Sequence, residues 1–223
     1  RCFLKLVSGF GTPGFFMKRS YKQNCALALA ADMLCERWTL LIFRELLIRA
    51  CRFKDFNDAL PGMGTNLLST RLKELEQAGL IEKQHCNDKR SAYQLTSKGL
   101  TVEPLVLQLI SWGHSHLSGH DEFSHQAHWD LLAMKALFNM QQFKTTFKPS
   151  QHYTLQFAGT AFVGWVQASH EGISIGLGHS LEQIIIPASY TVDMDVQEFQ
   201  NCMLENEIQD DDLQKFARCF GTP

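Results

Sequence analysis

The fold is decided by one stretch of the chain, Arg52-Phe53-Lys54-Asp55-Phe56-Asn57-Asp58-Ala59-Leu60-Pro61-Gly62-Met63-Gly64-Thr65-Asn66-Leu67-Leu68-Ser69-Thr70-Arg71-Leu72-Lys73-Glu74-Leu75-Glu76-Gln77-Ala78-Gly79. The spacing of its apolar residues predicts a short helix, a tight turn at residues 61–64 and a second helix that ends at Gly79. Two short strands are expected next, at residues 80–85 and 91–95. This order predicts a winged helix-turn-helix, a device that lays its second helix in the major groove of DNA.

The second helix of this unit, at residues 65–78, has an apolar stripe and an opposite polar face. Its leucines recur at helical spacing and should point inward. The outer side chains can hydrogen-bond to base edges, so the predicted DNA-binding residues of the helix are Asn66, Ser69, Thr70, Arg71 and Lys73. On the wing, Lys89 and Arg90 are expected to bind phosphates or to enter the minor groove. An ordinary solvated helix face and hairpin tip could carry the same residue types.

Further helices are expected on both sides of this unit. Asn24 can cap a helix at residues 25–34, and residues 38–48 are apolar almost all round, which favours a helix at the centre of the domain. A long helix is expected at residues 97–117, with Pro104 inside its early turns. That helix leaves apolar surface to cover, and such surface most often becomes a dimer interface. A two-fold protein can then match two DNA half-sites.

Charge differs between the two halves of the chain. The net charge of −2 over 223 residues argues against a nucleic-acid partner, but residues 17–118 hold 14 Lys+Arg against 10 Asp+Glu. Residues 119–223 hold 5 against 13. A basic first half beside an acidic second half fits a DNA-binding module joined to a part that avoids DNA, although two unlike globular domains would show the same contrast. No apolar run approaches the length of a membrane span, so no membrane partner is expected.

Cysteine usage indicates the compartment. The seven cysteines are scattered, form no Cys-x-x-Cys pair and have no histidine at zinc-finger spacing. Single thiols suit a reducing cytoplasm, which is the expected location. Residues 1–16 are broken by glycine and proline and lack the features of a signal peptide, so they are interpreted as a disordered extension or an artefact of the gene model.

The second half changes from a helical to a strand period. One amphipathic helix is expected at residues 123–147, and residues 154–157, 161–166 and 172–177 are expected to form an antiparallel sheet. Residues 189–194 are expected to form a further strand. Asp210-Asp211-Asp212 can cap a last helix. The predicted fold class is therefore α+β, with a winged helix-turn-helix domain at residues 17–118 and a smaller α+β domain at residues 119–223. The boundary is placed in the polar stretch of residues 113–122.

Short motifs across residues 25–113 are shared with a known family. They are Glu36-Arg37-Trp38-Thr39-Leu40-Leu41-Ile42, Arg44-Glu45-Leu46, Arg52-Phe53, Leu60-Pro61-Gly62, Leu67-Leu68-Ser69-x-Arg71-Leu72-x-Glu74-Leu75, Ala78-Gly79-Leu80-Ile81, Tyr93-x-Leu95-Thr96-x-x-Gly99 and Trp112-Gly113. Through them the chain resembles the HxlR-type family of bacterial winged helix-turn-helix regulators. The resemblance implies a homodimer paired through the first and last helices of the domain, with residues 65–78 as reader and 81–95 as wing. One departure is Leu34-Cys35-Glu36, where the family usually has Gly-Gly.

Cys25 is a candidate redox-sensing residue. The resemblance places it where some family members use a cysteine to sense oxidants or electrophiles. A thiol at a helix N-terminus gains from the positive end of the helix dipole, which favours the reactive thiolate. The alternative is a small apolar residue at a dimer interface.

The second half shows no catalytic constellation, and neither a metal nor another cofactor is expected. Five histidines lie between residues 114 and 128, but they lack a carboxylate or thiol at matched spacing. The order of elements in residues 123–205 resembles a sterol-carrier-protein-like domain, which implies a pocket for a small hydrophobic effector. The candidate pocket residues are Phe157, Phe162, Trp165 and Ile175, and plain core packing would use the same residue types.

Together these observations favour a homodimeric transcriptional regulator, acting as a repressor on double-stranded DNA, with an effector domain behind the reader. The alternative is a ligand-binding or protein-interaction module whose winged helix does not read DNA. An enzyme is not expected.

Overall fold

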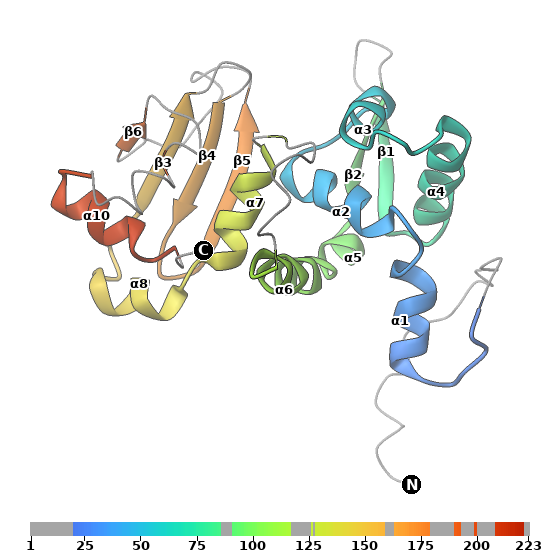
Figure 1. The fold of residues 1–223 in the computed structure, drawn as a ribbon, viewed down its shortest axis with the longest axis horizontal. Helices are drawn as coiled ribbons and strands as arrows, with labels where there is room; N and C mark the ends of the chain where they lie inside the picture. The colour runs from blue at the N-terminus through green and yellow to red at the C-terminus, as the bar shows by residue number, and fades with distance from the viewer. Residues whose placement is uncertain are drawn as a thin grey trace, which may run out of the picture.

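A computed structural model describes residues 20–85, 91–116, 126, 128–158, 163–178, 190–192, 199 and 208–220. The expectations for residues 1–16, for Lys89 and Arg90 and for Phe162 lie outside the described residues. The first part of the chain forms the expected winged helix-turn-helix (Figure 1). Its elements are α1 (Ala26–Leu34), α2 (Thr39–Ile48), α3 (Phe53–Ala59), α4 (Thr65–Gln77), β1 (Ile81–His85), β2 (Ser91–Leu95), α5 (Ser97–Leu100) and α6 (Glu103–His114).

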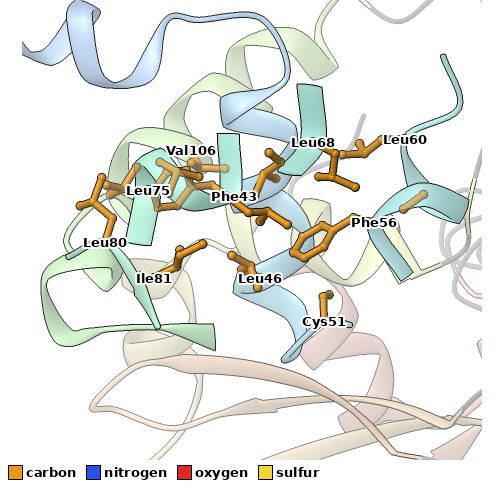
Figure 2. Close-up of a cluster of buried hydrophobic side chains, with 14 of the residues drawn as sticks. Phe43, Leu46, Cys51, Phe56, Leu60, Leu68, Leu75, Leu80, Ile81 and Val106 are labelled. Carbon is orange, nitrogen blue, oxygen red and sulfur yellow. The ribbon is translucent and has the colours of Figure 1, made fainter. Parts of the chain in front are cut away.

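The core of this part forms around α2, as its apolar sequence predicts. Phe43 and Leu46 of α2 pack with Phe56 of α3 and with Leu68 and Leu72 of α4 (Figure 2). Burial of such side chains is the main favourable contribution to folding. The wing is fixed to this core as well, because Ile81 of β1 is buried in it and Tyr93 of β2 pairs with Cys51.

The helix expected at residues 97–117 is wrong as a single helix. It is divided into α5 and α6, and Thr101 and Val102 separate them. Pro104 has no N–H to donate to the carbonyl of Leu100, so the hydrogen-bond ladder cannot run through this point. Gly99 in α5 allows a close approach, since a Cβ there would lie 1.9 Å from the carbonyl oxygen of Leu80. This contact fixes α5 against Leu80, the residue directly before β1.

The single helix expected at residues 123–147 is also wrong. The structure has α7 (His128–Leu137) and α8 (Met140–Thr146), with a break at Phe138 and Asn139. Asn139 caps α8 through its side chain, and its backbone N–H donates to the carbonyl of Cys219 at 2.6 Å. Phe138 forms a β-bridge with Phe220. The chain therefore turns where it meets the C-terminal segment, a long-range contact that helical periodicity cannot reveal.

The sheet of the second part has the strand order β5-β4-β3-β6. The strands are β3 (Tyr153–Ala158), β4 (Val163–Ala168), β5 (Ile173–Gly178) and β6 (Tyr190–Val192). β3, β4 and β5 pair antiparallel as expected, but β6 pairs parallel to β3. The further strand expected at residues 189–194 is thus present at Tyr190–Val192, and its parallel direction is a finding of the structure. A parallel neighbour requires a crossover connection, and the period-two pattern of a strand carries no information about its partner's direction.

Aromatic residues dominate the core of the second part. Phe143 of α8, Tyr153 of β3 and Phe216 of α10 (Asp211–Ala217) are buried against one another. The side chain of Asp210 accepts a hydrogen bond from the N–H of Leu213 and caps α10, which confirms the expected last helix. In Figure 1, α7 lies between this sheet and α2, so it is covered on both sides.

Candidate nucleic-acid interface

The turn between α3 and α4 sets the direction of α4. The N–H of Met63 donates to the carbonyl of Leu60 at 3.0 Å, and both of these side chains are buried. Between them Gly62 has a φ of 94°, in the left-handed region that other residues rarely adopt. The Leu60-Pro61-Gly62 sequence therefore forms a tight turn that fixes the position at which α4 begins.

The outer face of α4 carries four of the five predicted DNA-binding residues of this helix. Asn66, Ser69, Thr70 and Lys73 are all exposed, and the buried Leu68, Leu72 and Leu75 hold the opposite face. The hydroxyl of Thr70 donates to the carbonyl of Asn66 at 2.9 Å, which leaves its oxygen free to accept a hydrogen bond from outside. The helix thus presents amide, hydroxyl and ammonium groups together, which are the groups that major-groove readers use.

Arg71 is placed differently from the other four. Its side chain is only 12% exposed and forms ion pairs with Glu74 at 2.8 Å and with Glu36 at 3.3 Å. Glu36 lies in the short connection before α2. The structure therefore turns Arg71 toward the body of the domain, where it ties α4 to the start of α2.

Two exposed cations that the sequence analysis did not single out lie at the start of α3, the first helix of the unit. They are Arg52 and Lys54. The first helix of a helix-turn-helix crosses the DNA backbone, where cations can bind phosphates. The feature that identifies them is their position at the N-terminal end of a short helix directly before the reader, because their residue type alone is common on protein surfaces.

The comparisons with known proteins identify the family of this helix-turn-helix. The sequence model of the HxlR-like helix-turn-helix family matches residues 33–121. The HTH-type transcriptional regulator YvaP of Bacillus subtilis is 36% identical over 85 residues, which cover 37% of this chain and 79% of YvaP. The chain belongs to the HxlR-like helix-turn-helix family. The regulator YybR of the same organism is 30% identical over 97 residues, which cover 43% of this chain and 78% of YybR.

The family is one of transcriptional regulators, a class other than enzymes, as the sequence predicts. Among solved structures, the redox regulator HypR in its reduced form aligns with 44% of this chain and 100% of its own, with 27% identity and a TM-score of 0.40. The HxlR-like match ends at residue 121, so α7 and the sheet lie beyond the matched residues. None of the helices in the described ranges is long and apolar enough to cross a membrane.

The departure from the HxlR pattern at Leu34-Cys35-Glu36 has a visible outcome. α1 ends at Leu34, and Cys35 adopts a φ of −88°, which any residue can adopt. The unusual backbone is that of Trp38, which stands at the N-cap position of α2 with a φ of 79°. A non-glycine residue in this conformation is strained and persists only where packing holds it. The Trp38 side chain packs against the first core, which supplies that packing.

Cys25 lies at the N-cap of α1, one residue beyond the cap expected from sequence, and it is exposed. The backbone N–H groups of Ala28 and Leu27 in the first helical turn lower the pKa of its thiol. Burial has the opposite effect on two other thiols and raises the pKa of Cys51 to about 12 and that of Cys219 to about 11. Among these three thiols, Cys25 is therefore the one whose environment favours the nucleophilic thiolate.

The residues predicted to line a pocket in the second part do not share one face of the sheet. Ile175 pairs with Val166, and both pack toward the core that contains Phe157. Trp165 points to the opposite face, where its ring covers Gly176. Phe157 and Ile175 thus belong to the core side, and Trp165 lies across the sheet from them.

The described histidines near the boundary, His114, His116 and His128, belong to no group arranged to hold a metal ion. Within the described ranges, no group of three or more His, Cys, Asp or Glu side chains is arranged to hold a metal ion. His116 packs its ring against Trp112, and His128 contacts the carboxylate of Glu45 at 2.8 Å. His120 and His125 lie outside the described residues.

Proposed function

We propose that this protein is a homodimeric transcriptional repressor that reads a pseudo-palindromic DNA site through α4, which we call the reader helix. The observation that carries the proposal is the exposed polar face of α4, with Asn66, Ser69, Thr70 and Lys73 presented by a helix that a glycine turn holds in place. Asparagine can bond adenine through two hydrogen bonds, and lysine can reach guanine or a phosphate. The wing, residues 81–95, is assigned to the adjacent backbone or minor groove, and Lys89 and Arg90 lie between its two strands in the sequence.

Exposed apolar side chains support the dimer. α1 exposes Leu27 at 77% and α6 exposes Trp112 at 67%, together with Leu105 and Leu109. Apolar side chains gathered on one face of a soluble protein mark an interaction site, and a symmetric dimer is the most common way to cover one. A dimer built on α1 and α6 would present two reader helices to successive half-sites. Repression is the simplest outcome, because a protein bound to promoter DNA excludes the polymerase.

The second part of the chain is assigned to effector binding in a reducing cytoplasm. The location follows from the scattered single thiols. The effector is a small hydrophobic molecule, as the resemblance to sterol-carrier-like domains suggests. The structure divides the candidate pocket residues between two faces of the sheet, with Phe157 and Ile175 packed in the second core and Trp165 on the opposite face.

Selection of bound sequences from genomic DNA tests the main proposal. The purified full-length protein is expected to enrich one motif with two-fold symmetry at moderate salt. Sedimentation of the complex should give two protein chains for each site. No enriched motif would overturn the regulator and favour the alternative, a winged helix that pairs with protein or ligand.

A second candidate activity, oxidant or electrophile sensing by Cys25, is supported by the exposure of this thiol and by its lowered pKa. Modification would add bulk or charge at the start of α1, within the proposed dimer interface. The test is a DNA-binding assay before and after treatment with diamide or methylglyoxal. Loss of binding in the wild type, but not in Cys25→Ser, is expected, and equal responses of the two proteins would exclude this role.

A further inference from the structure

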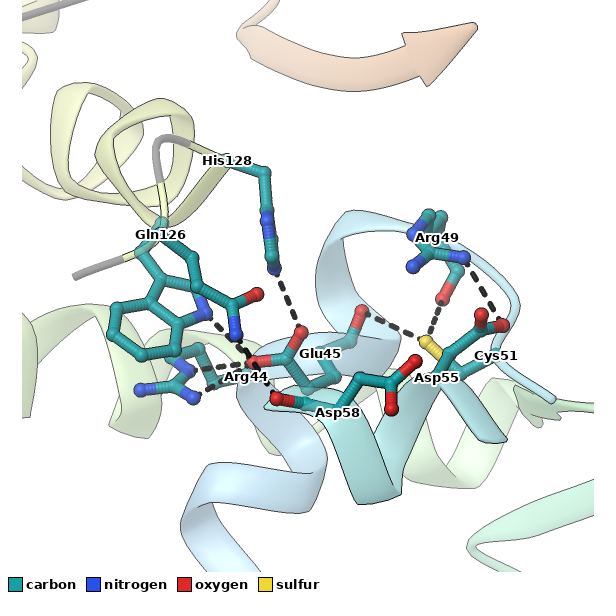
Figure 3. A network of polar contacts seen from close by, with 9 residues as sticks. Arg44, Glu45, Arg49, Cys51, Asp55, Asp58, Gln126 and His128 are labelled. Carbon is teal, nitrogen blue, oxygen red and sulfur yellow. Dashed lines mark hydrogen bonds and ion pairs between the residues drawn. The ribbon is translucent and has the colours of Figure 1, made fainter. Parts of the chain in front are cut away.

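A buried carboxylate joins the two parts of the molecule. Glu45 of α2 has a side chain that is only 2% exposed. Its Oε1 accepts hydrogen bonds from Nε of Arg44 and Nε1 of Trp129, both at 2.8 Å, and its Oε2 lies 2.8 Å from Nε2 of His128 (Figure 3). Arg44 is the neighbour of Glu45 on α2, whereas His128 and Trp129 begin α7. The Glu45 carboxylate of the winged-helix part therefore contacts side chains that α7, at the start of the second part, supplies.

The partners of the Glu45 carboxylate together compensate for its burial. Burial alone would raise the pKa of Glu45, but the hydrogen bond from His128 and the charge of Arg44 outweigh burial, so that the pKa is lowered. The guanidinium of Arg44 also lies 3.7 Å from the centre of the Trp129 ring, which favours a cation–π contact. Removing one partner of a buried charge is strongly destabilising, because the charge then lacks a group that compensates for the water it lost on burial. A displacement of α7 would therefore change the contacts of Glu45 on α2 directly.

Apolar packing makes α7 common to both cores. Leu132 is fully buried among the side chains of the winged helix, whereas Leu131 and Met134 are buried in the core beneath the sheet. Two polar contacts also connect this segment to the winged helix-turn-helix. Lys135 of α7 pairs with Glu103 of α6 at 2.5 Å, and Gln126 donates to the carbonyl of Asp58 at 3.3 Å.

From α2 the connection continues to the reader helix. Phe43 and Leu46 of α2 share one buried core with Leu68 and Leu72 of α4 (Figure 2). The start of α2 is tied to α4 separately, through the ion pair between Glu36 and Arg71. α2 thus contacts α7 through Glu45 and contacts α4 through its apolar face. Close packing of this kind transmits small displacements, because a dense core cannot absorb them locally.

We propose that α7 is a coupling helix, which transmits the state of the sheet-containing part to α2 and through α2 to the reader helix. A ligand that shifts α7 would alter the bonds of Glu45 and thereby the DNA affinity of α4. The proposal rests on the proposed DNA binding for its functional readout. Its structural readout, the exposure of α2 and α4 to exchange, is independent of DNA.

The test uses the full chain with Trp129→Phe, which keeps an aromatic ring in place and removes the N–H that donates to Glu45. Trp165→Phe is the matched control, because this tryptophan lies on the sheet against Gly176 and has no part in the Glu45 contacts. DNA affinity is measured by fluorescence anisotropy on the selected site, and backbone amide exchange is followed in α2 and α4 by mass spectrometry. Trp129→Phe is expected to weaken DNA binding about five-fold or more and to speed exchange in both helices. Trp165→Phe should leave both quantities within about two-fold of the wild type.

The possible outcomes distinguish the coupling role of α7 from the proposed DNA binding. If the wild type binds DNA and Trp129→Phe changes neither affinity nor exchange, the coupling helix is overturned while DNA binding stands. If the wild type binds no DNA, the regulator is overturned and the exchange data still decide the coupling. Should Trp129→Phe fail to fold, Lys135→Gln takes its place and must speed exchange in α2 for the proposal to survive. Combining Glu45→Gln with Trp129→Phe should change affinity and exchange by less than the sum of the two single changes, because both substitutions act on the same group of Glu45 contacts, and additive effects would contradict the proposal.

Discussion

Arg71 of α4 and Glu36 before α2 form an ion pair at 3.3 Å, although they are 35 residues apart in the chain. The pair fixes the middle of the reader helix against the body of the domain. The residue type of Arg71 suggests a DNA contact, but its burial indicates that it acts by positioning α4. These two roles differ in their dependence on salt.

We expect Arg71→Ala to lower the free energy of unfolding by about 1 kcal/mol, since the partner Glu36 is partly exposed and the pair is screened by water. Binding should weaken for all DNA sequences, while the dependence of log K on log salt keeps its slope, because no phosphate contact is lost. Urea unfolding and a salt titration of DNA binding measure these quantities. A slope reduced by about 1 would instead identify Arg71 as a phosphate contact.

Lys73→Ala is expected to change which sequences are bound. A lysine that reaches a base discriminates by about 1–3 kcal/mol at one position, so the selected motif should become degenerate there. Lys54→Ala is the contrasting variant at the start of α3, and it should weaken binding to every sequence and flatten the salt slope. Repeating the selection with both variants separates the two roles. An unchanged motif for Lys73→Ala would remove this residue from the base contacts.

The apolar face of α6 gives a direct test of the dimer. Leu109→Glu places a charge among exposed apolar side chains, and it should convert the dimer to a monomer without unfolding the domain, because Leu109 is not part of the buried core. Sedimentation velocity measures the association state, and circular dichroism checks the fold. Lys144→Glu on α8 is the control and should remain dimeric. A Leu109→Glu dimer of wild-type affinity would place the interface elsewhere.

Thiol reactivity should follow the local environment. At pH 7.5, Cys25 is expected to react with iodoacetamide faster than the exposed Cys35, because the backbone N–H groups at the start of α1 lower its pKa. Cys51 and Cys219 should stay unmodified in the folded protein, because burial raises their pKa values to about 12 and about 11. Peptide mass spectrometry after short labelling gives the rates. Equal rates for Cys25 and Cys35 would argue against a special role for the helix start.

The Glu45 contacts predict a dependence of stability on acid. The pKa of Glu45 is lower in the folded protein than in the unfolded chain, so the stabilisation is present above the unfolded value, near 4.3, and is lost as the pH falls through the folded value. Urea unfolding of the wild type and of Glu45→Gln should therefore differ most near neutral pH, and the difference should narrow below about pH 4. A difference that stays constant from neutral to acid pH would show that the Glu45 charge contributes nothing to folding.

Local sequence patterns predicted the structure correctly where the apolar periodicity of a segment alone sets its secondary structure. The leucine spacing of α4 and the Pro61-Gly62 turn predicted the helix-turn-helix, and Asn66, Ser69, Thr70 and Lys73 fall on its exposed face as expected. The same reasoning failed at residues 97–117 and 123–147, where each predicted helix is divided. The second break depends on pairing of Phe138 with Phe220, which no local window contains.

The sequence by itself determined the family, the winged helix and the polar face of its reader helix, because motifs and periodicity are properties of neighbouring residues. Only the tertiary structure decided that Arg71 faces inward, that Trp165 lies across the sheet from Phe157 and Ile175, and that His128 contacts Glu45. His128 and Glu45 are 83 residues apart, and His128 resembles the other histidines of a polar stretch until folding brings it to a buried carboxylate. The physical reason is that burial and electrostatic pairing depend on which distant segments pack together, and a local pattern does not record those partners.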